Sequence, residues 1–141
     1  MNELNRKIIN DLQNNGRQSF AEIGRNVGLS APAVAERVQK MEEAGIIKGY
    51  SVLLDLEKLG CPVQAQITLK TAMTDFRTLV SKLDQFPEIL ECTKLTGENC
   101  VSLRVAVKNN SELEGLIDRL TRYGHPNTSI VLSSYQSSVR L

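Results

Sequence analysis

The sequence predicts an α+β protein with two domains, a helical one followed by one that combines a sheet with helices. Two patterns in the 141 residues carry this prediction. Up to Gly45, apolar residues recur at helical spacing; beyond Cys61, stretches of apolar–polar alternation are interleaved with helical stretches. We therefore expect a helical domain over 1–49, a strand and linker over 50–60, and a second domain over 61–141.

Three short helices are expected in the first domain. The first covers about 3–14, where apolar residues form one stripe, and it ends before Gly16. The second begins at Ser19, which forms a capping-box pattern with Glu22. The third begins at Ser30, a residue type that favours the start of a helix.

The junction between the second and third helices is the feature that indicates a function. Gly28 interrupts the second helix, and Pro32 lies in the first turn of the third, where a missing N–H is harmless. Two helices joined by a glycine-containing turn are typical of a helix-turn-helix. The residues that would contact DNA are Ser19, Ser30, Ala31, Pro32, Ala33, Glu36, Arg37 and Lys40. A plain three-helix bundle with a solvated charged face is the alternative.

Net charge does not decide between these interpretations. The formal charge is only +1, whereas many DNA-binding domains are more basic. Binding would then need well-placed cations or several copies acting together. No apolar run approaches the roughly 20 residues that span a bilayer, and the start of the chain has no apolar signal-peptide core. A cytoplasmic protein with no membrane partner is expected.

A strand is predicted over 46–54, because this segment is rich in β-branched residues and alternates. It would either form a wing beside the helices, which gives a winged-type helix-turn-helix, or pair with the same strand of a second subunit.

The second domain is expected to be ferredoxin-like, with the order β-α-β-β-α-β. Alternating patterns predict strands over 63–70, 88–95, 101–108 and 128–138, and helical spacing covers about 76–83 and 111–120. The helices would cover one face of the sheet. Apolar residues of both parities in the second and fourth strands suggest that a partner subunit covers the other face: Ile89, Leu90, Cys92, Leu95, Ile130, Val131 and Leu132.

Catalytic and metal chemistry are poorly supported. The single histidine, His125, lies in a predicted loop, and the three cysteines have no disulfide or zinc spacing. We expect no enzyme activity and no cofactor. The turn 96–100 is the candidate small-molecule site, because its backbone amides could hold a carboxylate and Glu98 or Asn99 could hold an ammonium. A hairpin turn that needs Gly and Asn for its backbone is the alternative.

Several runs resemble the Lrp/AsnC (feast/famine) transcriptional regulators: Leu4 to Ile9, Asn15 to Phe20, Val27 to Ser30, Val34 to Val38 and Gly45 to Tyr50, with Glu91-Cys92 and Thr96-Gly97 further on. The resemblance implies binding to double-stranded DNA, homodimers that assemble to octamers or similar rings, and an amino acid as effector. It places the effector between dimers near the turn after the second strand, at Gly97, Glu98, Asn99 and Cys100, with Ser133 and Ser134 nearby.

The turn departs from the family pattern, which often has Gly-Asp, a second Asp or Asn, and an aromatic. Here it reads Gly-Glu-Asn-Cys-Val. Enzymes of the same architecture resemble sirohaem decarboxylases and are the rival class. A tetrapyrrole substrate would be expected to need several His and Arg groups, and the single His125 argues against it. A ligand sensor that no longer binds DNA is a third interpretation, which the capping box and Arg37 disfavour.

Overall fold

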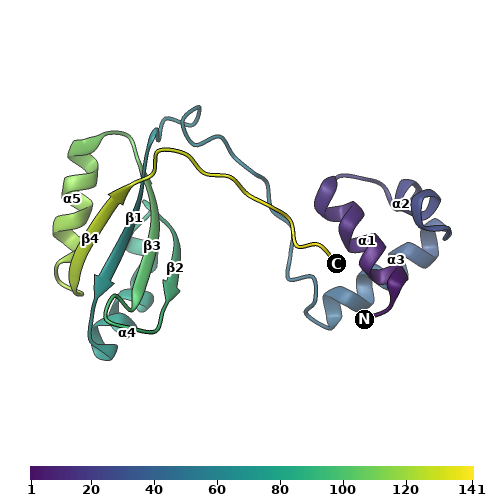
Figure 1. The fold of residues 1–141 in the computed structure, drawn as a ribbon, viewed down its shortest axis with the longest axis horizontal. Coiled ribbons are helices and arrows are strands. Elements are labelled where there is room, and N and C mark those ends of the chain that lie inside the picture. The colour runs from purple at the N-terminus through teal and green to yellow at the C-terminus, as the bar shows by residue number, and fades with distance from the viewer. The chain divides into compact units, whose positions relative to one another are not determined.

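The computed structural model describes residues 1–141 and divides them into two compact units (Figure 1). One unit comprises Met1–Leu53 together with Tyr135–Leu141, and the other Leu54–Ser134. Each unit has its own hydrophobic core. None of the helices combines the length and the apolar character that crossing a membrane requires.

The first unit is built from three helices, α1 (Glu3–Asn14), α2 (Phe20–Val27) and α3 (Ala31–Glu43). All three contribute to its core, which consists of Ile8, Ile23, Val34, Val38 and Met41. These residues lie on the apolar stripes of the sequence, so the predicted helices are confirmed. Phe20, which helical spacing places on the inward side of α2, is instead 38% exposed.

The strand predicted over 46–54 does not form in the single chain. Ile46 and Ile47 donate backbone hydrogen bonds to the Met41 carbonyl, at 2.9 and 3.1 Å, and so close the end of α3. From Lys48 to Asp55 the chain has no regular structure. A strand needs a neighbour to pair with, and no segment of this chain lies beside it as one. The prediction of a wing is therefore wrong, while pairing with a second subunit stays a prediction.

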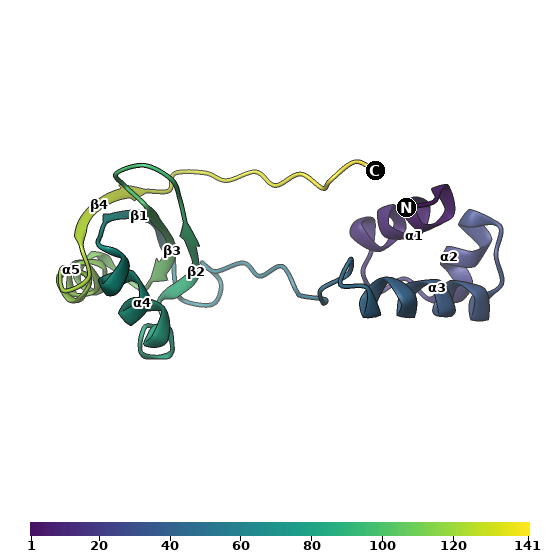
Figure 2. The same ribbon diagram turned by 90° about the horizontal axis from the view of Figure 1, so that it is seen from below.

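The second unit is a four-stranded antiparallel sheet with helices on one face (Figure 2). The strand order is β2-β3-β1-β4, as the ferredoxin-like prediction requires. Its elements are β1 (Val63–Lys70), α4 (Met73–Ser81), a short 3-10 helix η1 (Leu83–Gln85), β2 (Ile89–Lys94), β3 (Val101–Val107), α5 (Asn110–Leu120) and β4 (His125–Ile130).

Alternate residues of β1 and β3 form the core of this unit with apolar residues of α4 and α5. Ile67 and Leu103 pair across the two central strands and are both fully buried, as are Leu79 of α4 and Leu116 of α5. The residues that alternate in the strands and those at helical spacing in α4 and α5 therefore pack together in one apolar layer.

The last strand begins and ends earlier than predicted, over His125–Ile130 rather than 128–138. Residues 125–127, expected to belong to a loop, already pair with β1, since Lys70 is the partner of His125. Gly124 permits this, because a Cβ there would lie 2.6 Å from the Lys70 carbonyl oxygen. The two backbones come closer than any other residue would allow.

The sheet face away from the helices is polar, contrary to the prediction of an apolar one. Ile89 pairs with Val105 and Glu91 with Arg104, so Leu90 is an extra residue in a β-bulge. The bulge reverses the alternation, and Ile89 and Cys92 therefore both pack on the same core. Apolar residues of both parities in this strand do not indicate two apolar faces.

Candidate nucleic-acid interface and effector turn

Two capped helix starts hold the helix-turn-helix segment. The Ser19 hydroxyl accepts from the Glu22 backbone N–H at 3.1 Å, and the Glu22 carboxylate accepts from the Ser19 N–H at 3.1 Å. The Ser30 hydroxyl accepts from the Ala33 N–H at 3.3 Å. Each serine oxygen satisfies an amide that would otherwise lack a partner, so the sequence signals for both helix starts are confirmed.

The turn between α2 and α3 is tight. Gly28 has a φ of 78°, a left-handed conformation that closes α2. The backbone N–H groups of Gly28 and Leu29 both donate to the Gly24 carbonyl, at 2.8 and 2.9 Å. A Cβ on Gly24 would lie only 2.3 Å from the Leu29 carbonyl oxygen. Gly24 thus lets the two helices approach, a role that sequence reasoning missed.

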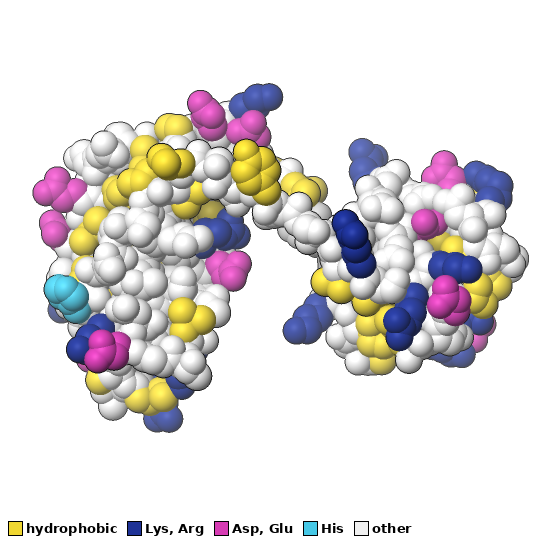
Figure 3. Space-filling model, in the orientation of Figure 1, with side chains coloured by type: hydrophobic (Ala, Val, Ile, Leu, Met, Phe, Trp, Pro, Cys, Tyr) yellow, Lys and Arg dark blue, Asp and Glu magenta, His cyan; other side chains and the backbone are white.

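One side of α3 is buried and the other is open to solvent. Val34, Val38 and Met41 are buried in the core, while Pro32, Glu36 and Lys40 are exposed on the other side. Ala31, Ala33 and Arg37 lie between and are partly exposed. Pro32, Glu36 and Lys40 therefore share one accessible face, while Ala31, Ala33 and Arg37 are less accessible. In Figure 3, basic and acidic side chains intermix on the visible surface of this unit.

Charged groups on this face pair with one another. Lys40 Nζ lies 2.8 Å from Glu36 Oε1, one helical turn away. The hydrogen bond and positive charge of Lys40, with a smaller contribution from Arg37, hold the pKa of the Glu36 carboxyl below its usual range. Lys40 therefore faces solvent with its charge partly offset.

A cavity of about 290 Å³ lies beside this face, lined by Asn5, Leu29, Ala33, Glu36, Arg37 and Lys40. Arg37 Nη1 donates to Asn5 Oδ1 across it at 3.0 Å. Asn5 belongs to α1 and was not among the predicted site residues. Nothing in the sequence pattern marks it, because the contact joins helices more than 30 positions apart.

The predicted effector turn joins β2 to β3. It is closed by a hydrogen bond from the Leu95 N–H to the Cys100 carbonyl at 2.6 Å. Gly97, Glu98 and Asn99 are exposed. Cys100 is different, because its thiol points inward and lies 3.3 Å from the Thr71 carbonyl oxygen. Three of the four predicted turn residues are thus accessible to a ligand.

The two serines predicted to lie near this turn are at the other end of the sheet. Leu69 pairs with Val101, which places the turn at the late end of β1. Ala65 pairs with Ile130, the last residue of β4. Ser133 and Ser134 follow β4 and therefore lie beyond the early end of β1. Ala65 and Leu69 are four positions apart along β1, which separates the two ends by about 13 Å. A single chain does not bring the two sets together.

Two family models match the chain. The AsnC-type helix-turn-helix domain matches residues 1–42, and the Lrp/AsnC ligand binding domain matches residues 63–141. The chain belongs to the Lrp/AsnC family. The resemblance seen in the sequence is therefore confirmed.

Among its relatives, the HTH-type transcriptional regulator FL11 of Pyrococcus horikoshii is 31% identical and aligns over 100% of this chain and 95% of its own length. The structure of Bacillus subtilis LrpC has a TM-score of 0.90 at 29% identity and covers 98% of this chain and 99% of its own. A Neisseria meningitidis transcriptional regulator in complex with L-Met has a TM-score of 0.87 at 28% identity, covering 100% and 96%.

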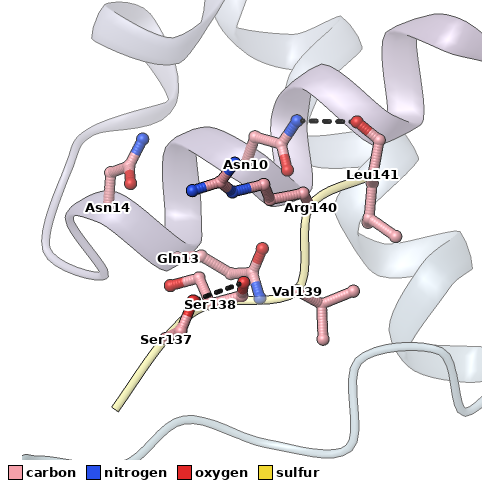
Figure 4. Close-up of a pocket in the computed structure, with 8 residues that line it drawn as sticks. All are labelled: Asn10, Gln13, Asn14, Ser137, Ser138, Val139, Arg140 and Leu141. Atoms are coloured by element: carbon pink, nitrogen blue, oxygen red, sulfur yellow. Dashed lines mark hydrogen bonds between the residues drawn. The ribbon is translucent and has the colours of Figure 1, made fainter. Parts of the chain in front are cut away.

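The acidic residues, the histidine and the cysteines of this Lrp/AsnC chain give little support for metal binding or catalysis. No three His, Cys, Asp or Glu side chains come together as a metal site. The cysteines are free, and burial raises the pKa of the Cys92 thiol, which disfavours the reactive thiolate. A cavity of about 410 Å³ lies where the C-terminal segment runs along α1, and Figure 4 shows its amide and hydroxyl lining. One hydrogen bond there, from Asn10 Nδ2 to the Leu141 carbonyl at 3.4 Å, ties the segment to the helix.

Proposed function

We propose that this protein is a sequence-specific DNA-binding transcriptional regulator whose assembly or DNA affinity responds to a small molecule, an amino acid. The observation that carries the proposal is the accessible face of α3, held on the tight Gly24–Gly28 turn within a chain that matches an AsnC-type helix-turn-helix. As a regulator of genes it would act in the cytoplasm.

In this proposal the start of α3 enters the major groove. Ala31 and Ala33 are small enough to let the helix backbone approach base edges, while Arg37 and Lys40 supply the positive charge. Ser19 and Ser30 cap their helices through oxygen, which leaves each hydroxyl hydrogen free to donate to a phosphate. Pro32 and Glu36 complete the predicted contact face.

A homodimer would place two such helices in successive major grooves, about one helical turn apart. The segment after α3 supports an association between subunits, because Val52 and Leu53 are 73% and 89% exposed although both are apolar. Pairing of this segment with its copy would cover them. Further assembly of dimers into octamers or similar rings would raise the effective concentration of each DNA-binding unit and offset the low net charge.

The effector would bind at the turn after β2. Exposed backbone amides around Gly97 suit a carboxylate, and Glu98 or Asn99 suits an ammonium, which together describe an amino acid. The relative crystallised with L-Met supports this class of ligand. Because Ser133 and Ser134 lie at the opposite end of the sheet, they would join this site only from another subunit.

Two measurements test the proposal. Duplexes enriched from a random pool by the full chain should share a sequence, and binding to them should change when one amino acid is added. The same amino acid should raise the melting temperature, since a ligand at about 100 times its Kd stabilises a protein by about 2.7 kcal/mol. Failure to enrich any sequence would contradict DNA recognition, and twenty amino acids without an effect on melting or binding would contradict the effector.

A further inference from the structure

The contact between Arg37 and Asn5 gives α3 a cation that is oriented but not neutralised. Arg37 Nη1 donates to Asn5 Oδ1 at 3.0 Å in a partly buried contact. Asn5 is itself held in place, because its backbone N–H donates to the capping side chain of Asn2 at 3.0 Å. The guanidinium has five N–H donors, and this hydrogen bond uses one of them.

Lys40, the other cation of this face, is paired with a carboxylate. Lys40 forms a 2.8 Å ion pair with Glu36, so a nearby carboxylate offsets its charge. Arg37 has a smaller influence on the same carboxyl than Lys40 has. Its direct hydrogen-bond partner is a neutral amide. Of the two cations that line the cavity, Arg37 is therefore the one with more of its charge available to a phosphate.

We propose that Asn5 is a positioning residue for DNA binding, which fixes the Arg37 guanidinium beside the exposed face of α3 and leaves its charge free. This role rests on the proposed DNA-binding function. The role depends on the Asn5 side chain being a neutral amide. A carboxylate at the same place would hold the guanidinium equally well but would form an ion pair that competes with a DNA phosphate.

The substitution Asn5→Asp separates positioning from mere packing, because it keeps the shape of the side chain and adds only charge. A carboxylate in the first turn of α1 is favoured by the helix dipole, so the melting temperature should stay the same or rise. DNA affinity should fall roughly tenfold, the size expected for one lost charged contact. The slope of log K against log salt should fall by about 0.9, the value for one phosphate.

The assay is fluorescence anisotropy of the full chain with a labelled random-sequence duplex of about 40 base pairs, between about 50 and 200 mM salt. Arg37→Ala gives the slope change for complete loss of the contact. Asn14→Asp is the matched control, since it adds the same charge to the same helix about 13 Å further along its axis. It should leave the salt slope unchanged.

Asn5→Ala provides a second, independent variant. It removes the acceptor without adding charge, so affinity should fall several-fold while the salt slope stays that of the wild type. If Asn5→Asp binds with the wild-type slope and affinity, or Asn5→Ala binds as tightly as the wild type, Asn5 does not position Arg37 for DNA. A wild-type chain that fails to bind the duplex at 50 mM salt would instead contradict the DNA-binding function itself, and this role with it.

Discussion

Replacing Gly24 by alanine should damage the helix-turn-helix, although the same replacement in an ordinary helix stabilises it. The new Cβ would lie 2.3 Å from the Leu29 carbonyl oxygen and 3.3 Å from its carbonyl carbon. Both atoms belong to backbone, which cannot rotate away as a flexible side chain would. The turn must open, and the hydrogen bonds from Gly28 and Leu29 to the Gly24 carbonyl must lengthen.

The expected magnitude follows from two opposing contributions. Gly→Ala in a helix interior gains about 1 kcal/mol from backbone propensity. Overpacking against backbone typically costs about 1–3 kcal/mol, and two weakened hydrogen bonds of about 1 kcal/mol each add to it. We expect a net loss of about 2–4 kcal/mol for the helical unit. In a domain of this size that lowers the melting temperature by roughly 4–8 °C per kcal/mol.

Gly115 supplies a matched control within the same chain. It lies inside α5, and a Cβ there would meet nothing within 4 Å. Gly115→Ala should therefore stabilise the sheet unit by about 0.5–1 kcal/mol. In scanning calorimetry of the full chain, Gly24→Ala should lower the melting temperature of the helical unit, whereas Gly115→Ala should raise that of the sheet unit. If Gly24→Ala proves as stabilising as Gly115→Ala, the close approach of α2 and α3 does not exist as described.

Three further outcomes are expected. Ser30→Ala should lower the stability of the helical unit by about 1 kcal/mol in chemical denaturation, and Ser30→Asp should restore the cap; equal stability of all three chains would contradict the capping role. Arg37→Ala should weaken binding to an enriched duplex by about 1–3 kcal/mol in anisotropy titrations, and unchanged affinity would remove Arg37 from the interface. Desolvation, together with its hydrogen bond to Glu42, raises the pKa of Tyr50 to about 12, so its neutral phenol contributes stability that is complete below about pH 10 and is lost as the pH rises through 12. Tyr50→Phe should therefore lack the phenolate absorbance that develops near pH 12; an unchanged titration would contradict this assignment.

Sequence patterns predicted most of the fold because they reflect local rules. Ser19 and Ser30 mark helix starts through hydrogen bonds to residues only three positions away. In β1, residues toward the core alternate with residues toward solvent. The errors arose where a distant segment decides the structure. Leu90 became a bulge because of its pairing with β3, and the segment after α3 stayed irregular for want of a neighbouring strand.

The candidate DNA-binding face shows the same division. Pro32, Glu36 and Lys40 could be placed on the exposed side of α3 from helical periodicity alone. Asn5 could not, because its contact with Arg37 depends on how α1 crosses α3. Gly24 left a weak signal, a glycine inside a short helix four positions before the turn glycine, where a glycine should otherwise cost stability.

Sheet register gives a physical reason for the effector position between dimers that the family resemblance implies. Gly97 and Ser133 follow different strands, and the antiparallel pairings of β1 with β3 and with β4 send them to opposite ends of the sheet. No change of side-chain conformation spans the roughly 13 Å between these ends, because the strand length itself separates them. A ligand the size of an amino acid could meet both sets only where the turn of one subunit lies against the last strand of another. If both sets bind the effector, subunit association creates the site, and ligand binding must in turn favour the assembly that holds it.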